Sequence, residues 1–269
     1  MDGMIGPTLQ ARRYSGVNWL GLQTLLAREI RRFMKVAAQT LLAPLIMTIL
    51  YVAVFALALG GRGAPIGDAP YIDFLAPGLI MMGVINNAFQ NASSSLIIAK
   101  IQGNSVDFLM PPLSALELTI AFIGGAAARG MLVGLASAIA VAPFADIAPD
   151  HWWAVILFTA SASVIFGAAG LLGGVWADKF DHLAAFTNFV VTPLTFLSGT
   201  FYSVSALPEP FRAFVHWNPV FFLIDGFRYG FIGHADGPLL VAAVVSVGLA
   251  VALSALCWAV IRSGWRLKA

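Results

Sequence analysis

Long apolar runs, separated by short polar or turn-rich segments, restrict the fold of this sequence more than any other feature. A helix that crosses the hydrocarbon core of a bilayer needs about 20 apolar residues. The runs that are long enough predict six membrane-spanning helices, at about 36–59, 71–99, 116–142, 152–176, 183–201 and 239–261. Only 10% of the residues are charged, against about 25% in a soluble domain. The sequence therefore predicts an all-α integral membrane protein.

The segment before the first apolar run is amphipathic. Apolar residues of 20–35 fall near helical spacing, and the arginines of this segment form a basic side together with Lys35. A basic amphipathic helix suits the anionic headgroups at a membrane surface. We predict an interfacial helix at 20–35, which follows a polar cytoplasmic tail at 1–19 and opens a transmembrane domain at 20–269. The alternative is a solvated lead-in to the first span.

The stretch 193–231 is apolar but repeatedly interrupted. Proline, glycine, charged residues and histidine break it too often for one continuous span, and Pro208-Glu209-Pro210 turns the chain. Irregular backbone at membrane depth is tolerated only where protein covers it or where it lines a water-filled path. We therefore predict a re-entrant helical hairpin at about 205–232, before the last span. The alternative is a packed amphipathic loop.

Polar side chains inside the spans are candidate functional residues, because such groups usually face other helices or water rather than lipid. Two stripes at helical spacing and one arginine qualify: Asn87, Gln90, Asn91 and Ser94 on the second span, Asn188, Thr192 and Thr195 on the fifth, and Arg129 on the third. These residues either line a transport path or form hydrogen bonds between helices. The sequence leaves both interpretations open.

Lysine and arginine are distributed unequally between the two ends of the predicted spans. An even number of spans places both termini on one side of the membrane, and most basic residues of the chain fall on that side. Because basic loops remain in the cytoplasm, both termini are predicted to be cytoplasmic. The loops at 60–70 and 206–219 are then expected to face outward.

The sequence lacks the common motifs of catalysis. No lysine follows a glycine, so the chain has no phosphate-binding P-loop. The four histidines lack metal-ligand spacing, and the single cysteine cannot form an intrachain disulfide. A net charge of +2 is too small to suggest nucleic-acid binding. Energy for transport must then come from a partner or from an ion gradient.

One series of residues, spread over the interrupted stretch, carries a family resemblance. The series is Pro193, Leu197-Ser198-Gly199, Phe201-Tyr202, Leu207-Pro208, Asn218-Pro219 and Phe227-Arg228-Tyr229-Gly230. It resembles the hallmark of ABC-2 type permeases, the membrane subunits of bacterial ABC exporters for polysaccharides, lipo-oligosaccharides and drugs. The resemblance extends to the interfacial helix, the six spans and the hairpin, and it implies a location in the bacterial inner membrane.

The resemblance also implies partners and cofactors. In that family the permease works in the lipid bilayer as a dimer with a second copy of itself, and two ATPase subunits dock on its cytoplasmic face. ATP and Mg are then bound by the partner ATPase. No cofactor is expected in this chain, and no nucleic acid is expected as a partner.

Two groups of site residues follow from the same resemblance. The stretch that matches the family's coupling helix, the ATPase contact, is Gln102, Gly103, Asn104, Ser105, Val106, Asp107, Phe108 and Leu109. The residues singled out in the re-entrant region are Tyr202, Pro208, Asn218, Pro219, Asp225 and Arg228.

The residue types of 100–112 are typical of a short rigid lever. Gly103 allows a sharp reversal, Ser105 is able to cap a short helix, and Pro111-Pro112 stiffens its exit. Aromatic side chains often anchor an interface by filling a groove on the partner. Phe108 is therefore the expected aromatic anchor on the ATPase.

Together these inferences predict the permease subunit of an ATP-driven exporter for a glycan, lipid-linked or hydrophobic substrate, without a nucleotide site of its own. The alternative is an ion-coupled secondary carrier or channel that acts without an ATPase. Such carriers often bury acidic residues within spans, whereas the acids of this chain fall at span ends or in loops. The exporter is therefore favoured, and a membrane enzyme ranks third for lack of a catalytic set.

Overall fold

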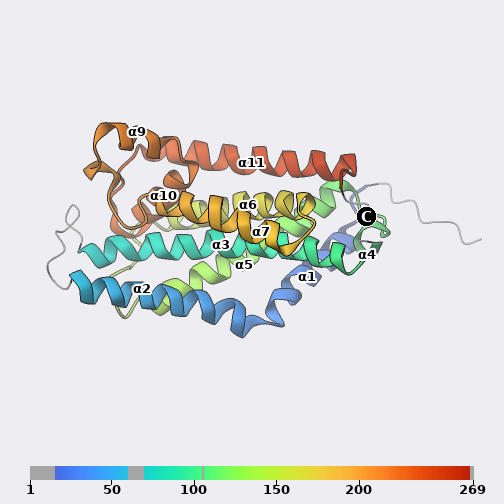
Figure 1. The fold of residues 1–269 in the computed structure, drawn as a ribbon, viewed down its shortest axis with the longest axis horizontal. Coiled ribbons are helices and arrows are strands. Elements are labelled where there is room, and N and C mark those ends of the chain that lie inside the picture. The colour runs from blue at the N-terminus through green and yellow to red at the C-terminus, as the bar shows by residue number, and fades with distance from the viewer. Residues whose placement is uncertain (1–15, 60–69, 105, 267–269) are drawn as a thin grey trace, which may run out of the picture.

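The computed structural model describes residues 16–59, 70–104 and 106–266, which form helices joined by short loops (Figure 1). The all-α prediction is confirmed for this part of the chain, which contains no strand. Most of the predicted tail at 1–19 and nearly all of the predicted outward loop at 60–70 lie outside the described residues. Five of the described helices are long and apolar enough to cross a membrane: Ala38–Ala58, Tyr71–Ile101, Ala115–Val141, Trp152–Trp176 and Leu239–Ser263.

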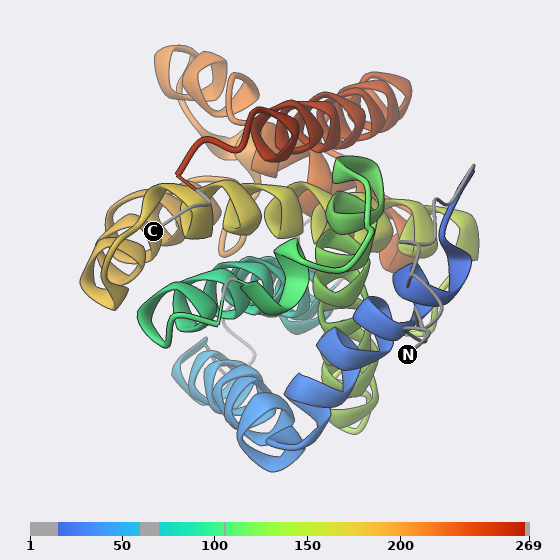
Figure 2. The same ribbon diagram turned by 90° about the vertical axis from the view of Figure 1, so that its right-hand side faces the viewer.

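Helix α3 (Tyr71–Ile101) is the centre of the bundle. It packs between α5 (Ala115–Val141) and α6 (Trp152–Trp176), while α2 (Ala43–Leu59) and α11 (Leu239–Ser263) lie on outer sides (Figure 1, Figure 2). In the most apolar window of α3, 78% of the residues are buried, against 11% in the first span and in α11. The second predicted span, which carries the stripe from Asn87 to Ser94, is thus mostly enclosed by protein. The more uniformly apolar helices α2 and α11 lie on the outside.

Glycines allow α3 and α6 to approach each other closely. A Cβ atom at Gly170 would lie 2.2 Å from the carbonyl oxygen of Phe89, and one at Gly174 would lie 2.9 Å from the Cβ of Leu96. Only a residue without a side chain fits so near to a neighbouring backbone. Small residues spaced by four positions favour this kind of close packing between membrane helices.

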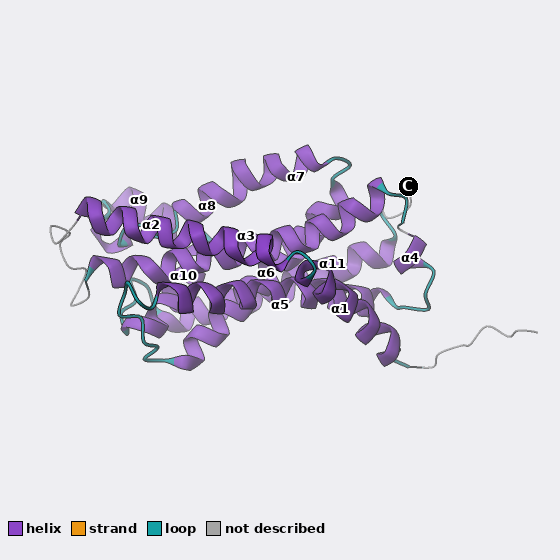
Figure 3. Cartoon of the chain, turned by 90° about the horizontal axis from the view of Figure 1, so that it is seen from below, coloured by secondary structure: helices purple, strands orange, loops and turns teal. Residues whose placement is uncertain are grey.

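The segment predicted as the fifth span is an interrupted helix. It runs through α7 (Phe180–Phe186), a π-helical turn η2 (Thr187–Val191) and α8 (Thr192–Phe196), along one side of the bundle (Figure 3). The predicted bounds, 183–201, are wrong at the carboxyl end, because the helix stops at the end of α8 and Gly199 takes a positive φ of 74°. A helix of this length extends for about 25 Å, which is slightly less than the hydrocarbon core of about 30 Å.

The segment predicted as a hairpin consists of two helices of unequal burial. The short helix α9 (Glu209–His216) is mostly exposed, whereas α10 (Pro219–Ile232) is buried against α3, α6 and α11. The Asn218 side chain accepts a hydrogen bond from the Val220 N–H at 3.0 Å and so caps α10, and Pro219 occupies its first turn. Both residues favour a helix start, which explains why the chain reverses there.

The two ends of the bundle carry different elements. Helix α1 (Trp19–Met34), the short helix α4 (Val106–Leu109) and the end of α11 lie at one end (Figure 1). The start of α3 and helix α9 lie at the opposite end. The start of α1 and the end of α11, the first and last described helices, thus lie at the same end of the bundle.

Candidate functional site

A cavity of about 990 Å³ opens between the junction of α1 with α2, the second half of α3, and the segment from α7 to η2. Its polar lining consists of Arg32, Gln39, Thr40, Asn87, Gln90, Ser93, Ser94, Arg129, Thr187 and Asn188. Its apolar lining consists of Phe33, Val36, Ala43, Pro44, Met47, Ile98, Phe180, Leu183 and Ala184. The cavity therefore has a mixed surface, and it lies in the half of the bundle nearer to α1 and α4.

Arg129 reaches this cavity from α5. Its Nη2 donates to Asn87 Oδ1 on α3 at 2.9 Å, and Asn87 Nδ2 in turn donates to the Gly83 carbonyl at 3.0 Å. The Arg129 Nε is buried and has no hydrogen-bond partner within the described part of the chain. The neutral amide of Asn87 thus accepts the hydrogen bond from this guanidinium. The Nε–H of the guanidinium has no acceptor among the described residues.

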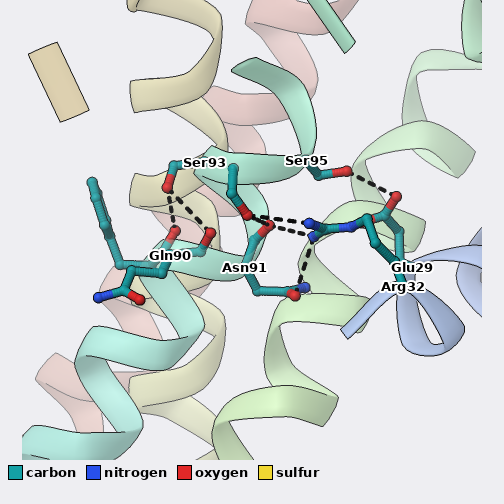
Figure 4. A network of polar contacts seen from close by, with 8 residues as sticks. Glu29, Arg32, Gln90, Asn91, Ser93 and Ser95 are labelled. Carbon is teal, nitrogen blue, oxygen red and sulfur yellow. Dashed lines mark hydrogen bonds and ion pairs between the residues drawn. The ribbon is translucent and has the colours of Figure 1, made fainter. Parts of the chain in front are cut away.

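The second arginine of the cavity, Arg32, belongs to a polar network that attaches α1 to α3 (Figure 4). Arg32 donates to Glu29 Oε2 through Nε at 3.3 Å and through Nη2 at 3.2 Å. The same Nη2 donates to the Asn91 carbonyl at 2.6 Å, and Nη1 donates to Ser94 Oγ at 3.2 Å. Ser95 Oγ donates to Glu29 Oε1 at 2.9 Å. The network fixes the carboxyl half of α1 against the centre of the bundle.

Two π-helical turns border the cavity. The first, η1 (Ala38–Leu42), connects α1 with α2 and contributes Gln39 and Thr40. The second, η2, contributes Thr187 and Asn188. Such turns are rare in proteins and frequently occur at functional sites. Their presence on both sides of one cavity singles it out within the described structure.

Most of the polar residues predicted inside the spans meet at this cavity. Asn87, Gln90, Ser94, Arg129 and Asn188 line it. Asn91 lies behind the lining and is fully buried, where it accepts from Arg32. The two threonines of the fifth-span stripe are placed elsewhere: Thr195 is buried and donates to the Thr192 carbonyl at 2.7 Å, and neither lines the cavity. Of this stripe the cavity therefore includes only Asn188, which lies in η2, while the two threonines follow in α8.

Sequence reasoning missed the part of the site that α1 supplies. The sequence predicts Arg32 on the basic side of an interfacial helix, toward lipid headgroups, yet its side chain points into the bundle. A signal was present: Glu29 falls in helical register with Leu22, Leu25 and Phe33, and all four are buried. A carboxylate on the apolar face of a basic helix requires a buried partner, because an unpaired buried charge is costly.

A second cluster surrounds Arg228 on α10. This side chain is fully buried, donates to the Phe74 carbonyl at 3.1 Å and the Gly199 carbonyl at 2.7 Å, and lies with its guanidinium 3.6 Å from the centre of the Phe74 ring. Asp225 accepts from the backbone N–H groups of Asp236 at 2.9 Å and Gly237 at 3.0 Å. These bonds join α10 to α3, to the loop that follows α8 and to the loop between α10 and α11.

The remaining residues singled out in the re-entrant region also have local partners. Asn218 Nδ2 donates to the Leu194 carbonyl at 2.8 Å and to Ser198 Oγ at 2.7 Å. The Tyr202 hydroxyl donates to the Leu197 carbonyl at 2.9 Å. Pro208 precedes α9 as its N-cap residue. The geometry gives these residues a structural role in this region, at a distance along the bundle from the cavity.

The segment that matches the coupling helix forms a turn and one helical turn at the α1 end of the bundle. Gln102, Gly103, Asn104 and Asp107 are exposed, and Gly103 has a positive φ of 69°, as expected for a sharp reversal. Ser105 lies outside the described residues. The four-residue helix α4 contains the Val106 and Leu109 positions.

The expectation for Phe108 is wrong. Its side chain is only 3% exposed and packs against the Phe122 ring in an edge-on arrangement, with the ring centres 5.5 Å apart. An aromatic group that is buried in its own bundle cannot fill a groove on a partner. An exposed apolar side chain that directly follows α4 is Met110, at 77%.

Among the described residues, no group of three histidine, cysteine, aspartate or glutamate side chains is placed to hold a metal ion. What the site offers is guanidinium, amide and hydroxyl groups together with an apolar wall. These groups bind and orient a molecule by hydrogen bonds and charge. They do not form the nucleophile–base arrangement of covalent catalysis.

The sequence matches the ABC-2 type transporter family over residues 21–232. It is 39% identical over 250 residues to the inner membrane transport permease YadH of Escherichia coli strain K12, which covers 93% of this chain and 98% of that protein. It is 23% identical over 219 residues to nodulation protein J of Neorhizobium galegae, covering 81% and 82%. The corresponding protein of Rhizobium leguminosarum biovar viciae is 24% identical over 224 residues, covering 81% and 83%. With the family pattern matched across most of its length and a permease related to it from end to end, the chain belongs to the ABC-2 type transporter family.

Proposed function

We propose that this chain is the permease subunit of an ATP-driven exporter in a bacterial inner membrane, and that a separate ATPase subunit hydrolyses the ATP. Family membership supports a membrane subunit of an ABC transporter. The observation that carries the proposal is the cavity, which gathers polar side chains of α1, α3, α5 and η2 inside a bundle of apolar helices. Polar surface among membrane-spanning helices is typical of a substrate path. The substrate is a glycan, a lipid-linked molecule or a hydrophobic compound.

A second copy of the chain completes the path. The cavity is bordered by α2 and by η2, and both elements have exposed apolar side chains, including Leu50, Val54 and Phe189. When two copies pack through these elements, their cavities face each other across the seam. A polar path that is bordered by lipid on one side would be costly, which favours this arrangement over a single copy.

The interrupted helix from α7 to α8 is the sixth crossing segment in this proposal. The pair α9 and α10 is the re-entrant hairpin, in which buried α10 dips toward the bundle centre. Both termini then face the cytoplasm, together with α4 and the α1 end of the cavity. The uneven distribution of lysine and arginine supports this orientation.

The ATPase docks on the α4 end of the bundle. The coupling segment, residues 102–109, presents its exposed polar residues and the adjacent Met110 to the partner, while Phe108 ties this segment to α5 through Phe122. A force applied to α4 then reaches α5, which carries Arg129. ATP and Mg are bound by the ATPase.

The alternative, an ion-coupled carrier or channel, is less well supported. None of the described residues that line the cavity is acidic. The buried carboxylates of Glu29 and Asp225 are already engaged by Arg32 and by backbone N–H groups. Carriers of this kind need acids that exchange protons or ions along the path.

Reconstitution in liposomes tests the proposed function. The permease is co-expressed with an ABC ATPase subunit from the same bacterium, and the two are purified together. We expect ATP hydrolysis to increase in the complex and a substrate to cross the bilayer only with ATP. Transport by the permease alone, driven by an ion gradient, would overturn the proposal.

Cysteine crosslinking tests the dimer and labelling tests the topology, both in a Cys257→Ser background. Leu50→Cys on α2 should crosslink two copies, whereas Val244→Cys, also apolar and exposed, on α11, should not.

Ala206→Cys should react with a membrane-impermeant thiol reagent in intact cells, and Asn104→Cys should not. The reverse labelling pattern would show that the orientation is inverted.

A further inference from the structure

The charges that face the cavity do not balance. Its lining includes two guanidinium groups, Arg32 and Arg129, and no carboxylate among the described residues. Arg32 is paired with the buried Glu29 at 3.2 Å. Arg129 has a hydrogen bond to the Asn87 amide, and none of the ion pairs in the described structure involves it. The cavity thus carries one positive charge in excess.

An unpaired arginine within a span is costly, because its charge is separated from water. Arg129 is half-buried, and its Nε is buried without a partner in the described part of the chain. Two amide side chains, Gln90 and Asn188, are exposed at the cavity wall. A guanidinium that has no carboxylate partner among the described residues, in a cavity that also presents amides, is suited to a planar or tetrahedral anionic group such as carboxylate, sulfate or phosphate.

The rest of the lining is apolar. This apolar surface, which cannot form hydrogen bonds with a charged group, includes Phe33, Pro44, Met47 and Leu183. The volume of about 990 Å³ is at the upper end of the range for small-molecule sites, roughly 300–1,000 Å³. A headgroup beside Arg129 leaves room for part of an alkyl chain along the apolar wall.

We propose that the cavity binds an amphiphile with an anionic headgroup, and that Arg129 is the residue that recognises its charge. This inference rests on the proposed transport function and names the chemical class of its substrate. In the proposed orientation the cavity lies at the cytoplasmic half of the membrane. An amphiphile enters it from the inner leaflet, with the headgroup toward α3 and α5 and the chain toward α2.

Photocrosslinking to the purified permease in phosphatidylcholine vesicles tests this assignment. The probe is an alkyl phosphate with a diazirine on its chain, and the matched control is the alcohol of the same chain. Both partition into the bilayer, so their difference reports the headgroup. We expect the phosphate to label cavity residues about tenfold more than the alcohol, the ratio that corresponds to one hydrogen-bonded charge. Equal labelling by the two probes would overturn the proposal.

Variants assign the selectivity to Arg129. Arg129→Gln should abolish the difference between the two probes, and Arg129→Lys should retain much of it because the charge remains. Arg212→Gln, which alters a partly exposed arginine on α9, outside the cavity lining, should leave it unchanged. If Arg129→Gln does not fold, the comparison of the two probes on the unaltered protein still tests whether the cavity prefers an anionic headgroup. Unchanged selectivity in a folded Arg129→Gln protein would overturn the role of Arg129.

Competition identifies the source of the anionic group. Displacement of the probe by phosphatidylglycerol in the vesicles supports the proposed site and shows that a bilayer lipid also occupies it. Displacement by inorganic phosphate alone would show that binding does not require the alkyl chain of the ligand, which would contradict an amphiphile site. These measurements use neither ATP nor the ATPase. A failure of the anionic site therefore leaves the transporter proposal standing, and a failure of ATP-driven transport leaves the labelling result valid.

Discussion

Two ion pairs in this protein have the same chemistry and different surroundings, which makes their comparison informative. Glu29–Arg32 on α1 and Glu209–Arg212 on α9 are both spaced by three residues, and in each pair the closest nitrogen and oxygen are 3.2 Å apart. In the first pair the side chains are 1% and 28% exposed for glutamate and arginine, and in the second they are 83% and 37% exposed. We predict that replacing both members of each pair with glutamine reveals a strong interaction in the first and a weak one in the second.

The expected size follows from the environment. Two unit charges at this distance attract by about 5 kcal/mol at an effective dielectric constant of 20. Removing Glu29 from water and the partial exposure of Arg32 reduce this value. A hydrogen bond to a charged group typically contributes about 1.5–3 kcal/mol, and we expect about 2 kcal/mol of coupling for Glu29–Arg32. An exposed pair such as Glu209–Arg212 contributes less than about 1 kcal/mol.

A double-mutant cycle measures both couplings. The free energy of unfolding is determined for the unaltered protein, each single Glu→Gln or Arg→Gln variant and each double variant, in mixed micelles by circular dichroism. Raising the salt concentration should reduce the coupling on α9 more than the coupling on α1, because salt screens exposed charges. The α1 cycle also reports on function, since Arg32 lines the cavity.

A coupling for Glu29–Arg32 that is no larger than the coupling for Glu209–Arg212 would refute this reasoning. It would mean that α1 is attached to the bundle by its apolar face alone. The network with Asn91 and Ser95 would then be a consequence of that packing.

Three further predictions concern the folded bundle and its partner. Gly170→Ala should lower the free energy of unfolding by about 1–3 kcal/mol, because its Cβ would meet the Phe89 carbonyl oxygen, whereas Gly248→Ala, with no atom within 4 Å, should not; equal thermal shifts would contradict the packing argument. Arg228→Met removes the hydrogen bonds from this side chain to two buried carbonyls and should cost about 3 kcal/mol, so an unchanged melting temperature would contradict a role of Arg228 in stability. Phe108→Ala should lower stability by about 3–5 kcal/mol, while Met110→Asp should preserve stability and weaken co-purification of the ATPase; unimpaired binding in the latter would move the docking site.

Much of the architecture could be predicted from the apolar runs alone. Five spans have a matching helix, and the amphipathic segment before the first of them is a helix as expected. The fifth predicted span was harder, because apolar residues continue past the point where the helix ends. Just after this end, Gly199 takes a positive φ and its carbonyl accepts a hydrogen bond from Arg228, a residue far along the chain. A pattern of apolar residues does not contain such a contact.

The site was predicted in part for a related reason. A polar residue within a span must face protein or water, so Asn87, Gln90 and Arg129 were identifiable one helix at a time. Which stripes share one cavity depends on how the helices are arranged, and the π-helical turn η2 separated Asn188 from the threonines that follow it. The aromatic character of Phe108 was visible, but its burial against Phe122 was not.

The sequence by itself determined that this chain enters a membrane, which segments are long enough to cross it, and which family it belongs to. These properties follow from local composition, from spacing along one helix and from a short series of residues. The tertiary structure alone decided that Arg32 faces inward, that Arg129 has an amide and, among the described residues, no carboxylate as its partner, and that both border one cavity. The physical reason is that pairing between buried charges depends on distances between helices, and those distances are set by close packing at positions such as Gly170.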